Sequence, residues 1–433
     1  MNIRDFKGNI YKTLPQASTN LLQDKKLISD VERIIEDVTT KKDKAVIEYS
    51  KNFDKIPDNF NIKASDEEIQ KAKEEIENNK ELKSIYEGFK VMAERVKKFH
   101  EEQLKQFNLQ GKWLIKTNGS VGQVIKPIES VCVYVPGGRA IYPSTLIMNV
   151  IPAKVAGVKN IYVSTPSKEG KVSPIILALS SEFGVNGVYK VGGALAVASF
   201  AFGTESIPKV NMIVGPGNKY FITAKKILSG IIGIDIIPGP SEIAIIADNG
   251  NPYYLALDTL SQLEHDPDSL GFVISNNKKL LDEIEANIHN ILKRASRKDI
   301  LQSSTSNLFF IEVEDINEGF NLVNEIGPEH LEVIVEGVDI ENIENFVYNA
   351  GTVLVGEYSS VTITDYLAGT NHVLPTSSTS KFYSPLGVYN FLKFYNIAKW
   401  TKEELEKDKN IISKLARYEG LEIHALAVEE RLK

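Results

Sequence analysis

The sequence predicts an α/β protein whose mostly parallel sheets are divided between two domains. From residue 130 onward, short apolar and β-branched segments alternate with segments of helical periodicity, an order typical of βαβ units. The expected strands are too many for one comfortable open sheet, so two sheet domains are predicted. Glycine-rich loops follow several of these strands, where ligands of open α/β sheets bind.

Residues 20–110 precede this region and are predicted to form helices that are rich in Lys and Glu. Acidic residues and lysines lie at helical spacing in 65–82, where Ser65 and Glu68 have the pattern of a capping box. A charge pattern of this kind is typical of a solvated helix face, so we assign it no catalytic role.

In the α/β region, expected strands and expected helices alternate along the chain. The expected strands, which are short and rich in β-branched residues, lie at 131–135, 160–164, 187–191, 212–214, 243–247, 272–275, 308–313, 331–335 and 352–355. The expected helices, which have apolar residues at helical spacing, lie at 144–156, 174–183, 194–202, 219–228, 253–263, 278–292 and 316–324. Past residue 380 the chain is rich in Tyr, Lys and Glu, and a helix is expected at 401–418.

Bulk properties exclude several classes of protein. The 50 basic and 57 acidic residues give a net charge of -7, which argues against a general nucleic-acid or anionic-membrane surface. The single cysteine, Cys132, excludes an internal disulfide and a cysteine-rich zinc site, and it fits a reducing cytosol. Neither an apolar leader segment nor a run of about 18 apolar residues is found. We therefore expect a soluble, cytoplasmic protein with no nucleic-acid or membrane partner.

Four glycine-rich segments, at 135–138, 192–193, 215–218 and 239–241, interrupt the α/β region. Such loops let a ligand approach the backbone closely and present N–H groups to anions at helix starts. One loop of this kind is more often a tight turn, but four in succession favour a nucleotide or substrate cleft. The sequence has no GxGxxG motif between an expected strand and an expected helix. It therefore does not predict the standard dinucleotide-binding loop of a Rossmann fold.

Scarce histidines gather beside acidic and amide side chains. Four of the six histidines fall in five polar clusters, which lie at 241–242, 262–265, 327–330, 365–372 and 419–424. Histidine is the usual neutral metal ligand and titrates near physiological pH. The clusters therefore predict an enzyme with a metal and proton-transfer site.

Each cluster also has a structural interpretation. Gln262 and His265 share one face of an expected helix, yet such a pair alone is more often a solvated C-terminal turn. If Asp365 and a further histidine converge on them, the nitrogen and oxygen donors suit zinc, or manganese as second choice. Glu329 and His330 are either a general base and acid or exposed residues of a helix-to-strand connector. The acid and imidazole of the terminal segment are either a surface feature or part of a tail that closes over a neighbouring subunit's site.

Taken together, these clusters resemble the histidinol dehydrogenase family. The likeness extends from about residue 25 to the C-terminus, and the order and spacing of its blocks are highly specific. The blocks are YVPGGRAIYPSTLIMNVIPAKVAGV (134–158), FGTESIPKV (202–210), VGPGN (214–218), PGPSEIAIIAD (238–248), LSQLEHDPDS (260–269), GPEHLEV (327–333), DYLAGTNHVLPT (365–376) and EGLEIHALAVEER (419–431).

The resemblance implies a zinc-dependent, NAD-linked alcohol and aldehyde dehydrogenase. Its reaction would be the four-electron oxidation of L-histidinol to L-histidine through L-histidinal with two NAD+, the last step of histidine biosynthesis. One Zn²⁺ per subunit would be held by Gln262, His265, Asp365 and His424. The catalytic pair would be Glu329 and His330. The substrate would be contacted by Ser241, Gln262, His265, His330, Asp365, His372, Glu419 and His424, and NAD+ by Tyr134, Leu195 and Asn218.

At Leu195 the chain departs from the family, which usually has GGAQA where this sequence has GGALA. A polar contact with NAD+ is therefore expected to be lost. A hydrogen bond contributes about 0.5–1.5 kcal/mol net, which is enough to raise the cofactor requirement but not to abolish oxidation.

The family's architecture is two incomplete Rossmann-like domains, a helical N-terminal segment and an extended C-terminal tail exchanged in a homodimer. Glu419 and His424 would then complete the partner's site. The resemblance divides the chain into an N-terminal arm at 1–25, a substrate and metal domain at 26–130 plus 240–380, an NAD-side domain at 131–239 and a tail at 381–433.

Two other interpretations remain open. A related zinc and NAD alcohol dehydrogenase would act on another small polyol, such as a sulfonated diol, and would differ at substrate-recognition positions. Glu419, His372 and the Glu329–His330 pair favour histidinol. A catalytically silent α/β binding protein would keep the fold and the metal, and Leu195 leaves this reading open. Turnover against several alcohols separates the three.

Overall fold

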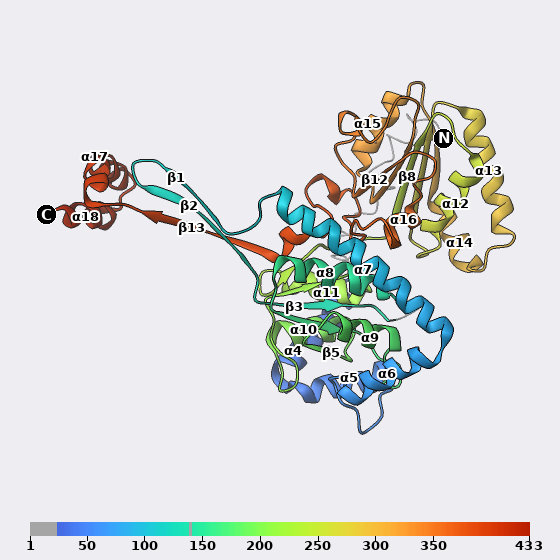
Figure 1. Ribbon diagram of the computed structural model, residues 1–433, viewed down its shortest axis with the longest axis horizontal. Coiled ribbons are helices and arrows are strands. Elements are labelled where there is room, and N and C mark those ends of the chain that lie inside the picture. Colours follow the sequence, from blue (N-terminus) through green and yellow to red (C-terminus); the bar gives the residue numbers. More distant parts are fainter. Residues whose placement is uncertain (1–23, 138–140) are drawn as a thin grey trace.

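The computed structural model describes residues 24–137 and 141–433 (Figure 1). Residues 1–23 of the predicted N-terminal arm and residues 138–140 of the first glycine-rich segment lie outside this part. The strands are β1 (Lys112–Lys116), β2 (Ser120–Pro127), β3 (Ser130–Tyr134), β4 (Asn160–Ser164), β5 (Gly187–Tyr189), β6 (Met212–Val214), β7 (Gly233–Ile234), β8 (Glu242–Ala247), β9 (Leu270–Ser275), β10 (Leu308–Glu312), β11 (His330–Ile334), β12 (Thr352–Val355) and β13 (Leu392–Lys399).

Helices separate most of these strands. They are α4 (Lys25–Lys41), α5 (Asp43–Asp54), α6 (Asp66–Asn78), α7 (Lys80–Gln106), α8 (Pro143–Ala156), α9 (Pro174–Glu182), α10 (Gly193–Phe202), α11 (Lys219–Leu228), α12 (Pro252–Leu263), α13 (Lys278–Leu292), α14 (Lys298–Ser304), α15 (Ile316–Ile326), α16 (Val361–Tyr366), α17 (Lys402–Tyr418) and α18 (Glu422–Glu429). Single 3₁₀ turns are η1 (Thr305–Asn307), η2 (Ile343–Asn345), η3 (Thr379–Lys381), η4 (Val388–Phe391) and η5 (Glu430–Leu432).

Two lobes are each built on a five-stranded parallel sheet, which confirms the predicted fold class. The first lobe has the strand order β5-β4-β3-β6-β7 and the second has β10-β9-β8-β11-β12, so the two sheets share one topology. All residues of β8 and β9 are buried, because helices cover both faces of a parallel sheet. Among the described residues, no helix is long and apolar enough to cross a membrane.

The N-terminal helices pack on the first lobe. Apolar residues of α4 share a buried cluster with β3 and α10, and those of α6 and α7 share another with α8 and α9. Ser65 and Glu68 form the predicted capping box at the start of α6. The expected division had joined residues 26–130 to the second lobe, whereas the packing groups α4–α7 with the first.

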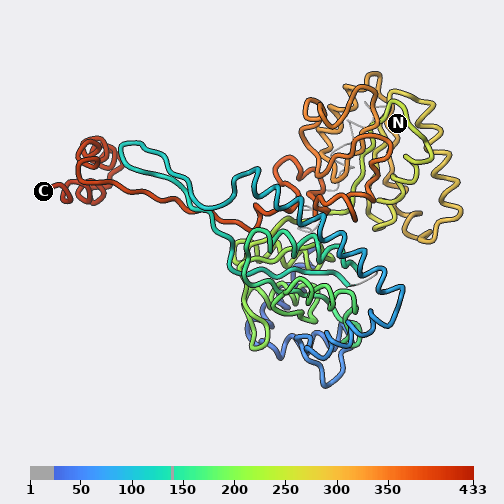
Figure 2. Tube along the Cα trace, viewed as in Figure 1, coloured from blue at the N-terminus to red at the C-terminus, as the bar shows by residue number. Residues whose placement is uncertain are grey.

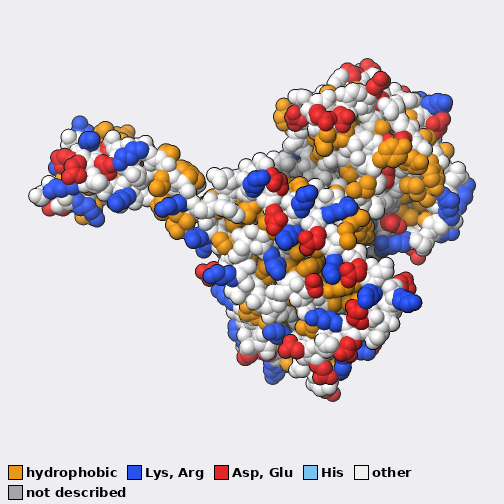
Figure 3. Space-filling view, viewed as in Figure 1, with side chains coloured by type: hydrophobic (Ala, Val, Ile, Leu, Met, Phe, Trp, Pro, Cys, Tyr) orange, Lys and Arg blue, Asp and Glu red, His pale blue; other side chains and the backbone are white. Residues whose placement is uncertain are grey.

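Residues 367–391 and α7 connect the lobes. Arg95 of α7 donates to the carbonyl oxygen of Leu367 at 2.8 Å, and the Asn371 amide donates to the Met148 carbonyl of α8 at 2.6 Å. The backbone N–H of Ser377 donates to the Glu242 carboxyl group at 2.9 Å, at the start of β8. This segment therefore brings loop residues of the second lobe onto the first, and the surface is hollowed where the lobes meet (Figure 3).

An arm extends from the two lobes and carries the C-terminus (Figure 2). It consists of the antiparallel sheet β1-β2-β13 with α17 and α18 at its tip. Helix α17, predicted at 401–418, is confirmed, and ion pairing of Lys116 with Glu404 ties it to β1. The strands β1, β2 and β13 were not predicted from the sequence, because each depends on a partner in the arm rather than on a lobe.

Candidate active site

Most of the predicted site residues gather at the amino-terminal edge of the second lobe's sheet. Glu242 opens β8 and His330 opens the neighbouring strand β11, in a register that pairs His330 with Ile243. Gln262 and His265 lie at the end of α12, directly before β9. The predicted site residues therefore lie at the edge opposite to the carboxyl edge, where open α/β sheets usually bind ligands.

The chain path explains this placement. Residues 235–241 run from the end of β7 in the first lobe straight to the start of β8 in the second. The carboxyl edge of one sheet is thus joined by a short linker to the amino edge of the other. The glycine-rich loops that follow β5 and β6 lie at that carboxyl edge.

The His330 imidazole is buried and has a fixed tautomer. Its Nδ1 lies 3.2 Å from the Glu242 carbonyl oxygen, which can only accept, so Nδ1 carries the proton. Its Nε2 has no hydrogen-bond partner within the described residues and lies 3.9 Å from the Asp365 carboxylate. The pKa of His330 is lowered to about 3, chiefly by burial and to a smaller extent by the nearby His265 and His372. The side chain is therefore neutral, with an unprotonated nitrogen facing Asp365.

Glu329 and Glu242 form a buried carboxyl pair beside this imidazole. The backbone N–H of Glu242 donates to Glu329 at 2.9 Å, and the Glu329 carboxyl group lies 3.7 Å from His330 Nδ1. Burial raises the pKa of Glu329 well above its usual value, and the charges of Glu242 and Asp365 add to the effect. Burial also raises the pKa of Glu242 to about 8. Both groups thus hold protons more tightly than an exposed glutamate.

Sequence reasoning named the Ser241–Glu242 cluster but gave Glu242 no role. The structure shows that Glu242 is fully buried and contacts both members of the Glu329–His330 pair through its backbone. The sequence did contain a sign of this role, because Glu242 is the first residue of a strand whose other residues are all apolar. Buried carboxyl groups without an ion partner are rare outside functional sites.

Three of the four expected metal ligands lie in this one site. The Gln262 amide donates to Asp365, which lowers the pKa of that carboxyl group, although burial dominates and raises it to about 6. Gln262 Oε1 is buried and has no partner within the described residues. His265 is open to solvent but lies close enough to lower the pKa of both His330 and His372, and its Nδ1 is 3.4 Å from the Ser241 hydroxyl.

These donors fit a zinc ion. An orphaned amide oxygen, a carboxylate and an imidazole at one place are the nitrogen and oxygen ligands that zinc binds. Within the described part of this single chain, no three His, Cys, Asp or Glu side chains are grouped closely enough to hold a metal.

His372 belongs to the same site from the side of the connecting segment. Its Nδ1 lies 3.1 Å from the carbonyl oxygen of Asp365, and burial lowers its pKa to about 4. The other two histidines of the lobes are elsewhere: His100 is buried within the packing of α7, and His289 is exposed on α13.

Glu419 and His424 do not reach this site. Both are exposed near α18, at the tip of the arm that points away from the lobes (Figure 1). The structure thus gathers Ser241, Gln262, His265, Glu329, His330, Asp365 and His372, and it leaves the two tail residues apart from them.

On the first lobe, the predicted cofactor residues lie at the carboxyl edge of the sheet. Tyr134 ends β3, and its hydroxyl accepts a hydrogen bond from the Gly193 N–H at 3.0 Å. Asn218 is exposed and caps α11 by accepting from the Tyr220 and Phe221 N–H groups, both at 3.1 Å. Leu195 is only 3% exposed and packs in the apolar cluster under α10. It offers no polar group to a ligand.

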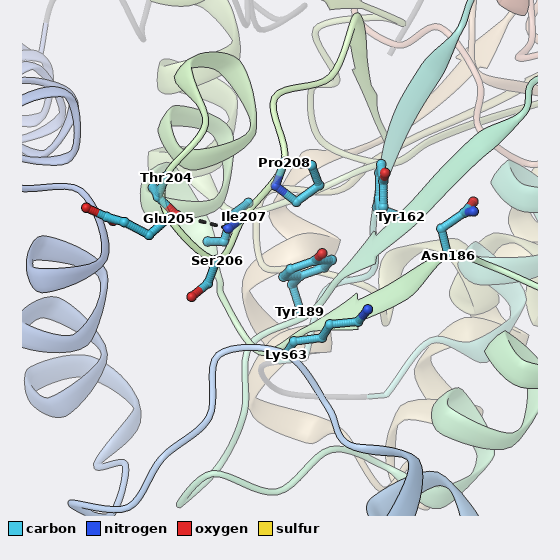
Figure 4. Close-up of a pocket in the computed structure, with 9 residues that line it drawn as sticks. All are labelled: Lys63, Tyr162, Asn186, Tyr189, Thr204, Glu205, Ser206, Ile207 and Pro208. Carbon is cyan, nitrogen blue, oxygen red and sulfur yellow. Dashed lines mark hydrogen bonds between the residues drawn. The ribbon is translucent and has the colours of Figure 1, made fainter.

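A pocket of about 430 Å³ lies on the first lobe, away from these residues (Figure 4). Its wall includes a loop at 204–208, in which the Ile207 N–H donates to the Thr204 hydroxyl at 3.0 Å. The pocket shares no residue with either predicted site. Its lining is Lys63, Tyr162, Asn186, Tyr189, Thr204, Glu205, Ser206, Ile207 and Pro208.

The chain is similar to known histidinol dehydrogenases in both sequence and structure. The family model described as histidinol dehydrogenase matches residues 18–432. A histidinol dehydrogenase of Bacillus cereus is 43% identical over 93% of this chain and 92% of its own length, and one of Bacillus thuringiensis is 42% identical over 99% and 97%. The crystal structure of histidinol dehydrogenase from Elizabethkingia anophelis superposes with a TM-score of 0.86 at 34% identity, covering 93% of this chain and 92% of that one.

Proposed function

The chain belongs to the histidinol dehydrogenase family, and from this premise we propose a role for each residue of the site. Members of the family are NAD-dependent oxidoreductases that catalyse the last step of histidine biosynthesis. The proposed reaction is the oxidation of L-histidinol to L-histidine through L-histidinal, with two NAD+ reduced to NADH. The observation that carries the assignment is the neutral His330 imidazole, whose Nε2 is unprotonated and unpartnered beside Asp365.

In the first oxidation, His330 accepts the proton of the substrate alcohol at Nε2 while a hydride leaves the carbinol carbon for NAD+. The Glu242 carbonyl supports this role because it holds the proton of the imidazole on Nδ1. The low pKa of His330 keeps the base neutral before the reaction. A general base needs both the correct protonation state and reach to the proton it removes.

In the second oxidation, Glu329 accepts a proton from water as the water attacks the aldehyde. The resulting hydrate loses a second hydride to NAD+ and becomes the carboxylic acid. Burial raises the pKa of Glu329, so its carboxylate, once deprotonated, is a stronger base than that of an exposed glutamate. The Glu242 N–H that donates to Glu329 orients the carboxyl group for this step.

We propose Gln262, His265 and Asp365 of one subunit and His424 of another as the ligands of a zinc ion. The ion would hold the nitrogens of the substrate and so orient its alcohol toward the cofactor. Ser241 and His372, which contact His265 and Asp365, would line the substrate beside it. Glu419 would pair with the ammonium or imidazole of the substrate. NAD+ would bind at Tyr134 and Asn218.

A homodimer with exchanged arms is part of the proposal. Large apolar side chains of the arm are solvent-exposed, and an exposed apolar patch marks an association surface. They include Trp113, Leu114, Ile115, Phe394, Tyr395, Ile411 and Leu415. Figure 3 shows hydrophobic side chains along this arm. A partner that covers them would also bring its own Glu419 and His424 to the incomplete site.

The first experiment measures NADH formation from L-histidinol by purified protein, with its zinc content determined beforehand. Two NADH per histidinol are expected, chelator should abolish turnover, and added zinc should restore it. Absence of histidinol-dependent NADH from well-folded, zinc-loaded dimer would overturn the assignment. Parallel assays with other small polyols give the substrate class.

Mixing two inactive variants tests the exchange of arms. His265→Ala and His424→Ala each spoil every site of their own homodimer. In a mixed dimer, one site keeps an intact His265 and receives an intact His424 from the partner, so about a quarter of the full activity should return after subunit exchange. If the arm instead folded back onto its own subunit, mixing would restore nothing.

A further inference from the structure

A buried ion pair in the first lobe has no part in the roles given above. Lys225 of α11 pairs with Asp235, which follows β7, and their side chains are 0% and 1% exposed. A buried ion pair contributes little net stability compared with apolar side chains of the same volume, because desolvation offsets the attraction. Stability alone therefore does not account for two charges placed in this core.

Both charged groups bind the same backbone residue, Gly215. The Gly215 N–H donates to Asp235 at 2.8 Å, and the Lys225 ammonium donates to the Gly215 carbonyl oxygen at 3.2 Å. Gly215 has a φ of +110°, and a Cβ at this position would overlap the carbonyl oxygen of Tyr134. The backbone at Gly215 thus passes close to the end of β3. The ion pair forms hydrogen bonds with both the N–H and the carbonyl oxygen of Gly215.

Gly215 begins the loop that ends at Asn218, the residue proposed to contact NAD+. The helix that Asn218 caps is the one that carries Lys225. The ring of Tyr134 stacks on Phe221 of this helix, with centroids 4.0 Å apart, and the ammonium of Lys225 lies 5.4 Å from the Phe221 ring. One connected set of contacts therefore links the ion pair to both proposed cofactor contacts.

Asp235 is also the first residue of the linker that leads to Ser241 in the second lobe. Farther along this linker, the Gly239 N–H donates to the hydroxyl of Thr376, in the segment that joins the lobes. The carboxylate of Asp235 thus connects the cofactor loop to the chain that enters the substrate site.

We propose that Lys225 and Asp235 are positioning residues for the cofactor. They fix the loop at 215–218 relative to the linker at 235–241, so that NAD+ bound on the first lobe meets the substrate held at the start of β8. This inference rests on the proposed binding of NAD+ at Tyr134 and Asn218. A hydride passes between two molecules only when their reacting atoms are held in a near-attack geometry.

The test compares Asp235→Asn with Glu68→Gln in the zinc-loaded enzyme. Glu68 is the partner of a second buried lysine of the same lobe, Lys190, at 2.8 Å, and it lies outside both sites. Each substitution leaves one buried lysine without its carboxylate, so each should lower the melting temperature. Only Asp235→Asn should raise the KM for NAD+, by about tenfold as expected for a lost hydrogen bond to a charged group. The KM for histidinol and the zinc content should not change.

The inference is overturned if Asp235→Asn leaves the KM for NAD+ at the value of Glu68→Gln, or if it raises the KM values of both substrates equally. Should Asp235→Asn not fold, the double variant Lys225→Met/Asp235→Asn removes both charges and is measured in the same way. Hydrogen exchange on the unmodified enzyme gives an independent readout. NAD+ should protect 215–218 and 235–237 together, and protection of the first segment alone contradicts the proposal.

Asn218→Asp separates this inference from the proposed function. Aspartate caps a helix as well as asparagine does, but its charge repels the phosphates of NAD+. A raised KM for NAD+ in Asn218→Asp with none in Asp235→Asn rejects the positioning role alone. An unchanged KM in Asn218→Asp rejects the proposed place of the cofactor, and with it the inference.

Discussion

The Glu242 carboxyl group gives a test of the site that does not need turnover. In the zinc-free protein, burial raises its pKa from 4.5 to about 8, so the folded protein keeps the group protonated at pH 7 while the unfolded chain does not. Glu242→Gln replaces the protonated carboxyl with a neutral group of the same shape. The amide oxygen can still accept the Ser377 N–H that Glu242 accepts at 2.9 Å.

The sign and size of the effect follow from proton linkage. The folded state binds the proton more tightly, so the free energy of unfolding of the unmodified protein falls as pH rises from 4.5 toward 8. Each pH unit in this window costs about 1.4 kcal/mol, or about 4 kcal/mol between pH 5 and pH 8. The Glu242→Gln variant has no carboxyl group to titrate at this position. Its free energy of unfolding should therefore equal that of the unmodified protein near pH 5 and exceed it by about 4 kcal/mol at pH 8.

Urea unfolding followed by far-UV circular dichroism, in chelator and at one protein concentration, measures the difference. Fixed concentration matters because association changes the apparent stability. Glu67→Gln on the surface of α6 is a suitable control, since Lys71 lowers the pKa of that exposed carboxyl group and its titration is complete below this window. Parallel pH profiles for Glu242→Gln and the unmodified protein would refute the claim that Glu242 is held neutral.

Further predictions concern the other residues of the site and the arm. Glu329→Gln should keep zinc and perform the first oxidation, but stall before the second; rapid-quench analysis should find one NADH per site, and histidine formed at the normal rate would remove the water-activating role. His265→Ala should lose zinc as measured by atomic absorption, because one of the three proposed ligands of the second lobe is missing; full zinc occupancy would contradict the ligand set. Removal of residues 401–433 should leave both lobes folded by circular dichroism but abolish turnover, since α17 pairs with Lys116 of β1 and with Asn118 in the turn that follows it; an active truncated monomer would exclude any role for His424.

Much of the fold follows from local sequence patterns. Buried parallel strands such as β8 and β9 are nearly continuous apolar runs, and the helices between them have apolar residues at helical spacing, so both were predicted within a few residues. The capping box at Ser65 is also encoded locally. The strands of the arm were missed because β13 pairs with β2 from a distant part of the chain, and β1 is exposed along its whole length.

The grouping of the N-terminal helices could not be read from local patterns either. Amphipathic helices such as α4 and α7 need an apolar surface, but nothing in their sequence specifies which lobe supplies it. Packing against α10 and α8 assigns them to the first lobe.

For the site, the sequence by itself determined the chemical groups: scarce imidazoles beside carboxylates, an amide at helical spacing and glycine-rich loops. Only the tertiary structure decided that Gln262, His330 and Asp365 meet at the amino ends of β8 and β11, because a short linker leads the chain from the carboxyl edge of the first sheet to the amino edge of the second. It also decided the protonation states. The tautomer of His330 and the neutral carboxyl of Glu242 arise from a carbonyl oxygen and from burial, and neither exists until strands far apart in the sequence pack together.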